Sequence, residues 1–153
     1  MHSEKKMVLE WKSNYQLEAR NEKGLSVKFD APITHGGEET ALSPMENVLA
    51  SLAACSSFHI LTILKKKRQR ISSYTVEAIA ERREDPPPRI FKKIHLKYSL
   101  KGQNIDPEAV KKSIQLSEEN TAQSVECSKK QLQSRHHLKL WKSKLGNLKL
   151  ETL

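Results

Sequence analysis

A cysteine and a histidine one helical turn apart are the residues of this sequence best suited to covalent chemistry. Cys55 lies in the segment AACSSFH, and His59 follows four positions later. Positions i and i+4 share one face of a helix, so an imidazole could assist the thiol. A thiolate is a nucleophile and is oxidised by peroxides to a sulfenic acid. A free cysteine is also a common small core residue, and the spacing alone leaves both interpretations open.

Few other residues have a pattern that predicts chemistry. Cys127 is the second of two cysteines, which are too few for a disulfide scaffold. His35 and the pair at 136–137 have no cysteine or carboxylate at metal-ligand spacing, so no metal site is expected. The five glycines match neither a dinucleotide-binding fingerprint nor a phosphate-binding loop, and no cofactor is expected.

The segment around Cys55 has the pattern of a long buried helix. Ser43 is a good N-cap, Pro44 suits the first helical position, and Glu46 completes a capping box. The run that follows, to Leu64, is almost uncharged and is apolar around most of its circumference, which is typical of a buried helix. About 22 residues at about 1.5 Å each give roughly 33 Å. We expect the central helix of the fold, available to pack against its copy in a dimer.

Alternating apolar and polar residues predict strands on both sides of this helix. Before it we expect three short strands and a loop, at 7–12, 15–20, 25–30 and 31–42. After it we expect two strands around a proline loop, a turn and a helix, at 71–83, 89–100, 101–104 and 107–119. Then follow a polar helical stretch, a strand and a loose end, at 120–135, 137–142 and 145–148. This order predicts an α+β fold with antiparallel sheet.

Length, composition and charge are typical of one basic domain. The chain has 153 residues, of which 37% are hydrophobic, enough for a single core. No run of 18 apolar residues and no apolar signal segment occurs, so we expect a cytoplasmic protein without a membrane span. The net charge is +9, and residues 129–153 hold seven basic residues against one acidic residue. The basic block at 65–70 closes the central helix, where cations complement the helix dipole, so nucleic acid is an unlikely main partner.

The segment SPMENVLASLAAC, residues 43–55, resembles the active-site helix of the OsmC/Ohr family of osmotically induced and organic hydroperoxide resistance proteins. Further similarity, which looks like the YhfA-like subgroup of that family, occurs at 63–66, 80–84, 89–91 and 116–119. The resemblance covers about residues 5–126 and leaves 129–153 as a basic C-terminal extension. It implies one OsmC-like α+β domain over residues 1–153, with antiparallel sheets around a long buried central helix in an intertwined homodimer.

The resemblance also implies thiol-dependent reduction of organic peroxides or hydrogen peroxide. By this analogy Cys55 is the nucleophile that becomes a sulfenic acid, and Cys127 condenses with it to a disulfide. The implied partners are a second copy of the chain, a small peroxide, and an external dithiol that reduces the disulfide. No cofactor or metal is implied.

The sequence departs from the family pattern at three points. The family's second cysteine is expected at Ala122 or Gln123, four or five residues before Cys127. The family's glutamate after the proline is replaced by Met45, and Glu46 comes one position later, mainly as the capping-box residue. The family's active-site arginine has no clear motif here, and the candidates are Arg20, Arg82, Arg83 and Arg89.

Two alternatives to a peroxidase therefore stay open. A catalytically weak protein of the same fold would bind a small ligand at a pocket in the dimer interface. A basic binding module would use residues 65–70 and 129–149 on an anionic partner. Steep salt dependence of binding is the property that distinguishes the second alternative.

Overall fold

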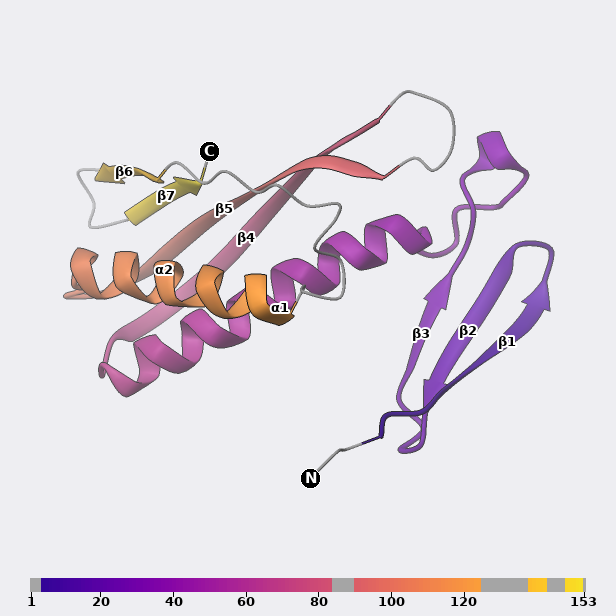
Figure 1. Cartoon of the computed structure of the whole chain (residues 1–153), viewed down its shortest axis with the longest axis horizontal. Coiled ribbons are helices and arrows are strands. Elements are labelled where there is room, and N and C mark those ends of the chain that lie inside the picture. The colour runs from indigo at the N-terminus through magenta and orange to yellow at the C-terminus, as the bar shows by residue number, and fades with distance from the viewer. Residues whose placement is uncertain (1–3, 84–89, 125–137, 143–147, 153) are drawn as a thin grey trace. The chain divides into compact units, whose positions relative to one another are not determined.

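The part of the chain that the structure describes contains two antiparallel sheets and two long helices (Figure 1). The computed structural model describes residues 4–83, 90–124, 138–142 and 148–152, with the side chains of the second helix described as far as Glu119. The elements in chain order are β1 (Met7–Ser13), β2 (Gln16–Asn21), β3 (Ser26–Phe29), the short 3-10 helix η1 (Ile33–His35), α1 (Pro44–Lys66), β4 (Arg70–Arg82), β5 (Phe91–Gln103), α2 (Pro107–Ser124), β6 (Leu138–Lys142) and β7 (Leu148–Thr152). The chain forms two compact units, Met1–Leu49 and Ala50–Leu153.

The first unit is a three-stranded sheet followed by a tightly held loop. The strands pair in the order β1-β2-β3, which confirms the three predicted strands. Asp30 is buried at the end of the sheet, and its carboxylate accepts hydrogen bonds from Ala31 N (2.8 Å), Thr40 N (3.0 Å) and Thr40 Oγ1 (2.7 Å). The donors on Thr40 are the main reason that the pKa of Asp30 is lowered. This carboxylate therefore holds together the loop that leads into α1.

The predicted capping box begins α1. Ser43 N and Ser43 Oγ donate to Glu46 Oε2 at 2.8 and 2.7 Å, and Glu46 N donates back to Ser43 Oγ at 3.4 Å. Two of these bonds satisfy backbone N–H groups that the start of a helix leaves without intrahelical partners, those of Ser43 and Glu46. The start of the helix that carries Cys55 is thus fixed by local sequence.

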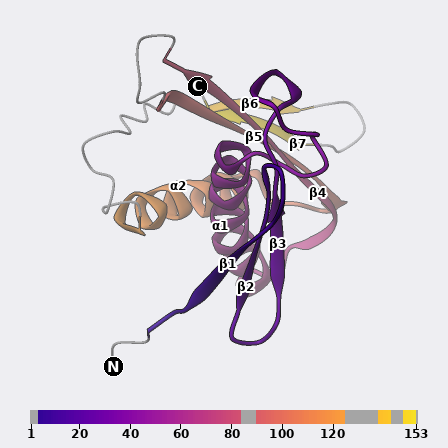
Figure 2. The same cartoon turned by 90° about the vertical axis from the view of Figure 1, so that its right-hand side faces the viewer.

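The second unit is a four-stranded sheet in the order β4-β5-β7-β6, with α1 and α2 packed on it (Figure 2). β4 and β5 form a long hairpin whose register runs from Arg70 opposite Gln103 to Arg82 opposite Phe91. The predicted alternation along both strands is confirmed, because their alternate apolar side chains face the helices. The buried core consists of Ile60, Leu64, Leu96, Tyr98, Leu100, Val110 and Ile114.

Two expectations about strand ends are wrong. The turn expected at 101–104 is mostly strand, because β5 continues to Gln103. Gly102 permits this pairing: a Cβ added there would lie 2.0 Å from the carbonyl oxygen of Arg70. Of the loose end expected at 145–148, residues 145–147 lie outside the described residues, and Leu148 instead begins β7, in which Leu148 and Leu150 pair with Leu100 and Tyr98 of β5. The strand predicted at 137–142 is confirmed as β6, and the polar stretch at 125–135 lies outside the described residues.

A Schellman motif ends α1 and turns the chain into β4. Arg68 N donates to Lys65 O and Gln69 N donates to Leu64 O, both at 3.0 Å. Arg68 occupies the left-handed position of this motif with φ 55°, where glycine is the usual residue and a side chain costs about 1 kcal/mol. The side chain of Gln69 accepts a hydrogen bond from Asp106 N at 2.8 Å, which joins the end of α1 to the start of α2.

Within one chain, α1 is buried along one stripe and not around its whole circumference as the sequence predicts. The buried residues are Ser56, Ile60 and Leu64, whereas the side chain of Phe58 is 72% exposed. By length and composition α1 would also be able to cross a membrane, with a mean hydropathy of 1.6 over its most apolar stretch. That test is weak evidence, because the core helix of a soluble protein passes it as well.

Candidate functional site

Cys55 lies midway along α1 as a free, partly buried thiol. At about 100° per residue, its position on the helix is roughly opposite the buried stripe of Ile60 and Leu64. The residues that share its face are exposed, namely Ser51, Phe58, His59 and Thr62. The thiol therefore lies on the open side of the helix, between a small hydroxyl residue, an aromatic ring and an imidazole.

The assistance predicted for His59 is not formed as a hydrogen bond. Both residues are described, His59 is exposed, and no hydrogen bond joins it to Cys55. The i, i+4 spacing does place them on neighbouring turns of one face. A role of His59 toward the thiol therefore stays a prediction.

A network of buried hydroxyl groups fixes the rotation of α1 behind Cys55. Ser56 Oγ lies 2.6 Å from Tyr98 Oη and 3.2 Å from Ser117 Oγ, and Ser117 Oγ donates to Ser56 O at 3.0 Å. One arrangement satisfies every hydroxyl: Tyr98 donates to Ser56, Ser56 to Ser117, and Ser117 to the Ser56 carbonyl. These contacts join α1 to β5 and α2, and they direct the neighbouring Cys55 away from the core.

A second hydroxyl pair lies beside the first. Tyr74 of β4 donates to Ser57 Oγ at 3.2 Å, and Ser57 Oγ donates to Ala53 O at 2.6 Å. The rings of Tyr74 and Tyr98 are 6.5 Å apart at an interplanar angle of 44°. Burial raises the pKa of Tyr74 to about 12 and also raises the pKa of Tyr98, so both phenols stay neutral donors.

Glu118 is the titratable group next to this network. It follows Ser117 on α2 and is partly buried, and burial together with the nearby Glu119 raises its pKa to about 7. Its charge also contributes to the raised pKa of Tyr98. Sequence reasoning missed this carboxyl, although one signal was available: Glu118 lies four residues after the inward Ile114, at the border of the buried face.

Glu46 is engaged at the start of the helix. Its carboxylate accepts both donors of Ser43, and these bonds lower the pKa of Glu46. This geometry agrees with the expectation that Glu46 serves mainly as the capping-box residue. In this chain the carboxylate of Glu46 therefore stabilises the N-terminus of α1.

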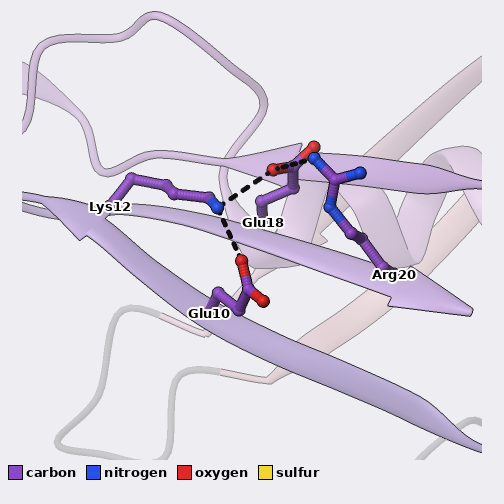
Figure 3. Close-up of polar contacts among 4 residues, drawn as sticks. All are labelled: Glu10, Lys12, Glu18 and Arg20. Atoms are coloured by element: carbon purple, nitrogen blue, oxygen red, sulfur yellow. Dashed lines mark hydrogen bonds and ion pairs between the residues drawn. The ribbon is translucent and has the colours of Figure 1, made fainter. Parts of the chain in front are cut away.

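Arg20 belongs to an ion-pair cluster in the first unit (Figure 3). Its Nη2 lies 2.9 Å from Glu18 Oε2, and Lys12 Nζ lies 3.4 Å from that oxygen and 2.6 Å from Glu10 Oε2. Glu10 and Glu18 are direct cross-strand partners, so Lys12 relieves the repulsion between them. Arg20 is the main cause that lowers the pKa of Glu18 to about 2. The guanidinium of Arg20 already has an ionised carboxylate partner.

The other predicted residues are placed as follows. Arg82 and Arg83 are exposed at the end of β4, and Ala122 lies in α2. Cys127, Arg89 and the histidines at 136–137 lie outside the described residues. Among the described residues, no group of three or more histidine, cysteine, aspartate or glutamate side chains could hold a metal ion.

Comparison with known proteins identifies the family. Residues 36–123, which include α1 with Cys55 and α2 as far as Gln123, match the family described as OsmC-like protein. The chain belongs to the OsmC-like family. Among curated relatives, Protein YhfA of Escherichia coli K12 is 37% identical over 81 residues. That match covers 53% of this chain and 60% of the relative, so the chain spans less than two thirds of the length of that relative.

Two solved structures share the fold of this chain. A hypothetical protein of Aquifex aeolicus superposes with a TM-score of 0.69 at 28% identity, covering 87% of this chain and 94% of the other. An organic hydroperoxide resistance protein of Elizabethkingia anophelis superposes with a TM-score of 0.60 at 13% identity, covering 88% of this chain and 95% of the other. The expected OsmC-like α+β fold is thereby confirmed.

Proposed function

We propose that this OsmC-like protein reduces organic peroxides or hydrogen peroxide through Cys55. The observation that carries the proposal is the free, partly accessible thiol at the middle of α1, inside the segment that matches the family. A protein named for organic hydroperoxide resistance shares the fold, which supports the proposal. The buried hydroxyl network supports the proposal because it keeps the thiol on the open face of the helix.

The proposed reaction has three steps. The Cys55 thiolate attacks one oxygen of the peroxide, the O–O bond breaks, and the leaving alkoxide takes a proton to become an alcohol. Cys55 becomes a sulfenic acid, so the sulfur is oxidised by two electrons and the peroxide is reduced. A thiol then condenses with the sulfenic acid to a disulfide and releases water, and an external dithiol restores the thiol by exchange. Cys127 is the proposed internal thiol for the condensation.

The second proposal is that the active form is a homodimer in the cytoplasm. The face of α1 that carries Cys55 also carries Phe58, which is 72% exposed, and Val48, which is 55% exposed. Apolar side chains of this size on the open face of a central helix favour burial against another copy of the same helix. Light scattering would test the dimer directly, and Phe58→Glu should shift it to monomer.

A ligand-binding protein of weak catalytic power is the alternative, and one observation favours it. Glu46 is fully engaged by Ser43, so it is not available to a substrate beside the thiol. In that case the partner would be a small molecule bound at the interface on the Cys55 face, with little peroxide consumption.

Intact mass after a stoichiometric pulse of organic hydroperoxide distinguishes these proposals. Loss of two hydrogens with turnover supports resolution by Cys127, and gain of one oxygen with turnover supports resolution by an external thiol. Cys55→Ser should abolish turnover, whereas Cys127→Ser should matter only if the internal disulfide forms. Full turnover by Cys55→Ser would contradict the mechanism, and no consumption by the unaltered protein would favour ligand binding.

A further inference from the structure

Cationic side chains from three segments gather at one end of the four-stranded sheet. The turn after α1, the start of β4 and the end of β5 meet there, since Arg70 pairs with Gln103 and Ser73 with Lys101. We call this set the basic corner. Its members are all exposed and are Lys65, Lys66, Lys67, Arg68, Arg70 and Lys101.

The acidic groups at this end are few and are placed at the start of α2. Asp106 and Glu108 are the two acidic residues there, and Asp106 Oδ1 accepts a hydrogen bond from Glu108 N at 3.0 Å. In the part of the chain that the structure describes, no ion pair involves any member of the basic corner. Six cations against two carboxylates leave a field that attracts anions.

Helix capping accounts for only part of this charge. Cations in the last turn of a helix complement its dipole, which explains Lys65 and Lys66. Arg70 and Lys101 lie on strands, where the dipole of α1 gives no such benefit. Arg68 has a left-handed φ of 55°, a conformation that favours glycine, yet a charged side chain is present there. Capping of α1 therefore does not explain the cations on the strands, nor the conformational free energy that a side chain costs at Arg68.

Two contacts hold the backbone at this end, so the positions from which the cationic side chains extend are fixed. Gln69 bonds the α1–β4 turn to Asp106 N, at 2.8 Å. Gly102 lets the Arg70 carbonyl lie against β5, where a Cβ would approach it to 2.0 Å. Cations on a folded backbone lose less conformational entropy when they bind than cations on a flexible tail do.

The composition of the corner favours one class of anion. None of the exposed large apolar residues described in the chain belongs to the corner; the nearest along α1 are Leu61 and Phe58, on earlier turns. An anionic membrane surface is best bound by cations accompanied by apolar side chains, and single-stranded nucleic acid is best bound by aromatic platforms. Duplex nucleic acid offers one negative charge per roughly 1.7 Å and needs neither.

We propose that the basic corner binds the phosphate backbone of duplex nucleic acid without sequence preference. This activity is separate from the chemistry of Cys55, which lies about ten residues earlier on α1. The sequence alone does not reveal the corner, because Lys101 joins the block at 65–70 only through the pairing of β4 with β5.

Fluorescence anisotropy with a labelled random duplex of about 20 base pairs, titrated from about 50 to about 200 mM NaCl, tests the proposal. Lys66→Gln/Lys67→Gln should lower the salt slope by about two and the affinity about tenfold at the lower salt. The matched control is Lys92→Gln/Lys93→Gln, which removes the same charge from exposed positions at the opposite end of β5. The control should change the affinity less than twofold.

Arg68→Gly separates binding from folding. It removes a charge and also the left-handed strain, so it should weaken duplex binding while leaving the thermal midpoint unchanged or raised. Equal losses in the Lys66/Lys67 and Lys92/Lys93 variants would overturn the proposal, because net charge alone would explain them. Binding to phosphatidylserine vesicles but not to the duplex would overturn it in favour of a membrane surface. Peroxide turnover should be the same in all these variants.

Discussion

Removing the hydroxyl of Ser56 should destabilise the protein more than removing it together with its partner on Tyr98. In Ser56→Ala the phenol of Tyr98, which is 1% exposed, loses its partner at 2.6 Å. A buried donor left without a partner costs about 1–3 kcal/mol. In Tyr98→Phe, Ser56 Oγ still has Ser117 Oγ at 3.2 Å, so only one neutral bond is lost, at about 1 kcal/mol. The double variant leaves no orphaned phenol, so adding Tyr98→Phe to Ser56→Ala should restore about 1 kcal/mol.

Urea unfolding of the four proteins in this cycle, followed by far-UV circular dichroism, measures the coupling directly. About 1 kcal/mol corresponds to roughly 2–4 °C in the thermal midpoint of a chain this long. The control cycle uses Tyr74 and Ser57, whose hydroxyls are 3.2 Å apart and less buried, and its coupling should be clearly smaller. A double variant that is less stable than Ser56→Ala, or additive within about 0.3 kcal/mol, would refute the role given to this network.

Four further substitutions test other parts of the structure. Glu118 has a pKa raised from 4.5 to about 7, so its ionised form is disfavoured by folding and stability is lost as pH rises through this range. Glu118→Gln should therefore flatten the pH dependence of the free energy of unfolding between about pH 4.5 and about pH 7, measured by urea unfolding at several pH values. Gly102→Ala should cost about 2 kcal/mol or more in urea unfolding, because its Cβ would meet Arg70 O at 2.0 Å. Gly24→Ala, with φ 79° but open space, should cost only about 1 kcal/mol. Ser43→Ala should lower the thermal midpoint through a loss of about 1 kcal/mol at the N-cap, and an unchanged midpoint would contradict that role.

Local patterns predicted most elements of the fold. The capping box at Ser43 and Glu46 and the alternation along β4 and β5 depend on neighbouring residues, so the sequence reveals them directly. The end of β5 was predicted as a turn because Gly102 and Asn104 are typical turn residues. The structure instead needs a glycine at position 102 because the carbonyl oxygen of Arg70 lies against it. Arg70 is more than 30 positions away in the sequence, so the local pattern does not reveal this contact.

The candidate site was only partly predictable for the same reason. Cys55 was found from its helix and its resemblance to a known family. The hydroxyl network behind it was not found, because its members are far apart in sequence. Tyr98 lies 42 positions after Ser56, and Ser117 lies 61 positions after it. Serine and tyrosine are also ordinary core and surface residues, so no composition signal marks them. The burial of α1 within one chain was overestimated. Apolar residues all round a helix predict that its faces are covered, but they do not indicate whether the same chain or another molecule covers each face.

The pairing of β7 with β5 has a consequence for the order in which the sheet forms. β4 and β5 are close in sequence, and their hairpin closes over a short loop, whereas Lys97 of β5 pairs with Glu151 of β7 more than fifty residues later. Local pairings form faster than distant ones because less chain entropy is lost in closing them. On the ribosome, the helices and the hairpin can therefore assemble while this stretch of β5 still lacks its second neighbour. Until residues 148–152 pair with it, that edge can accept a strand from another chain, so misassembly is a hazard during this interval.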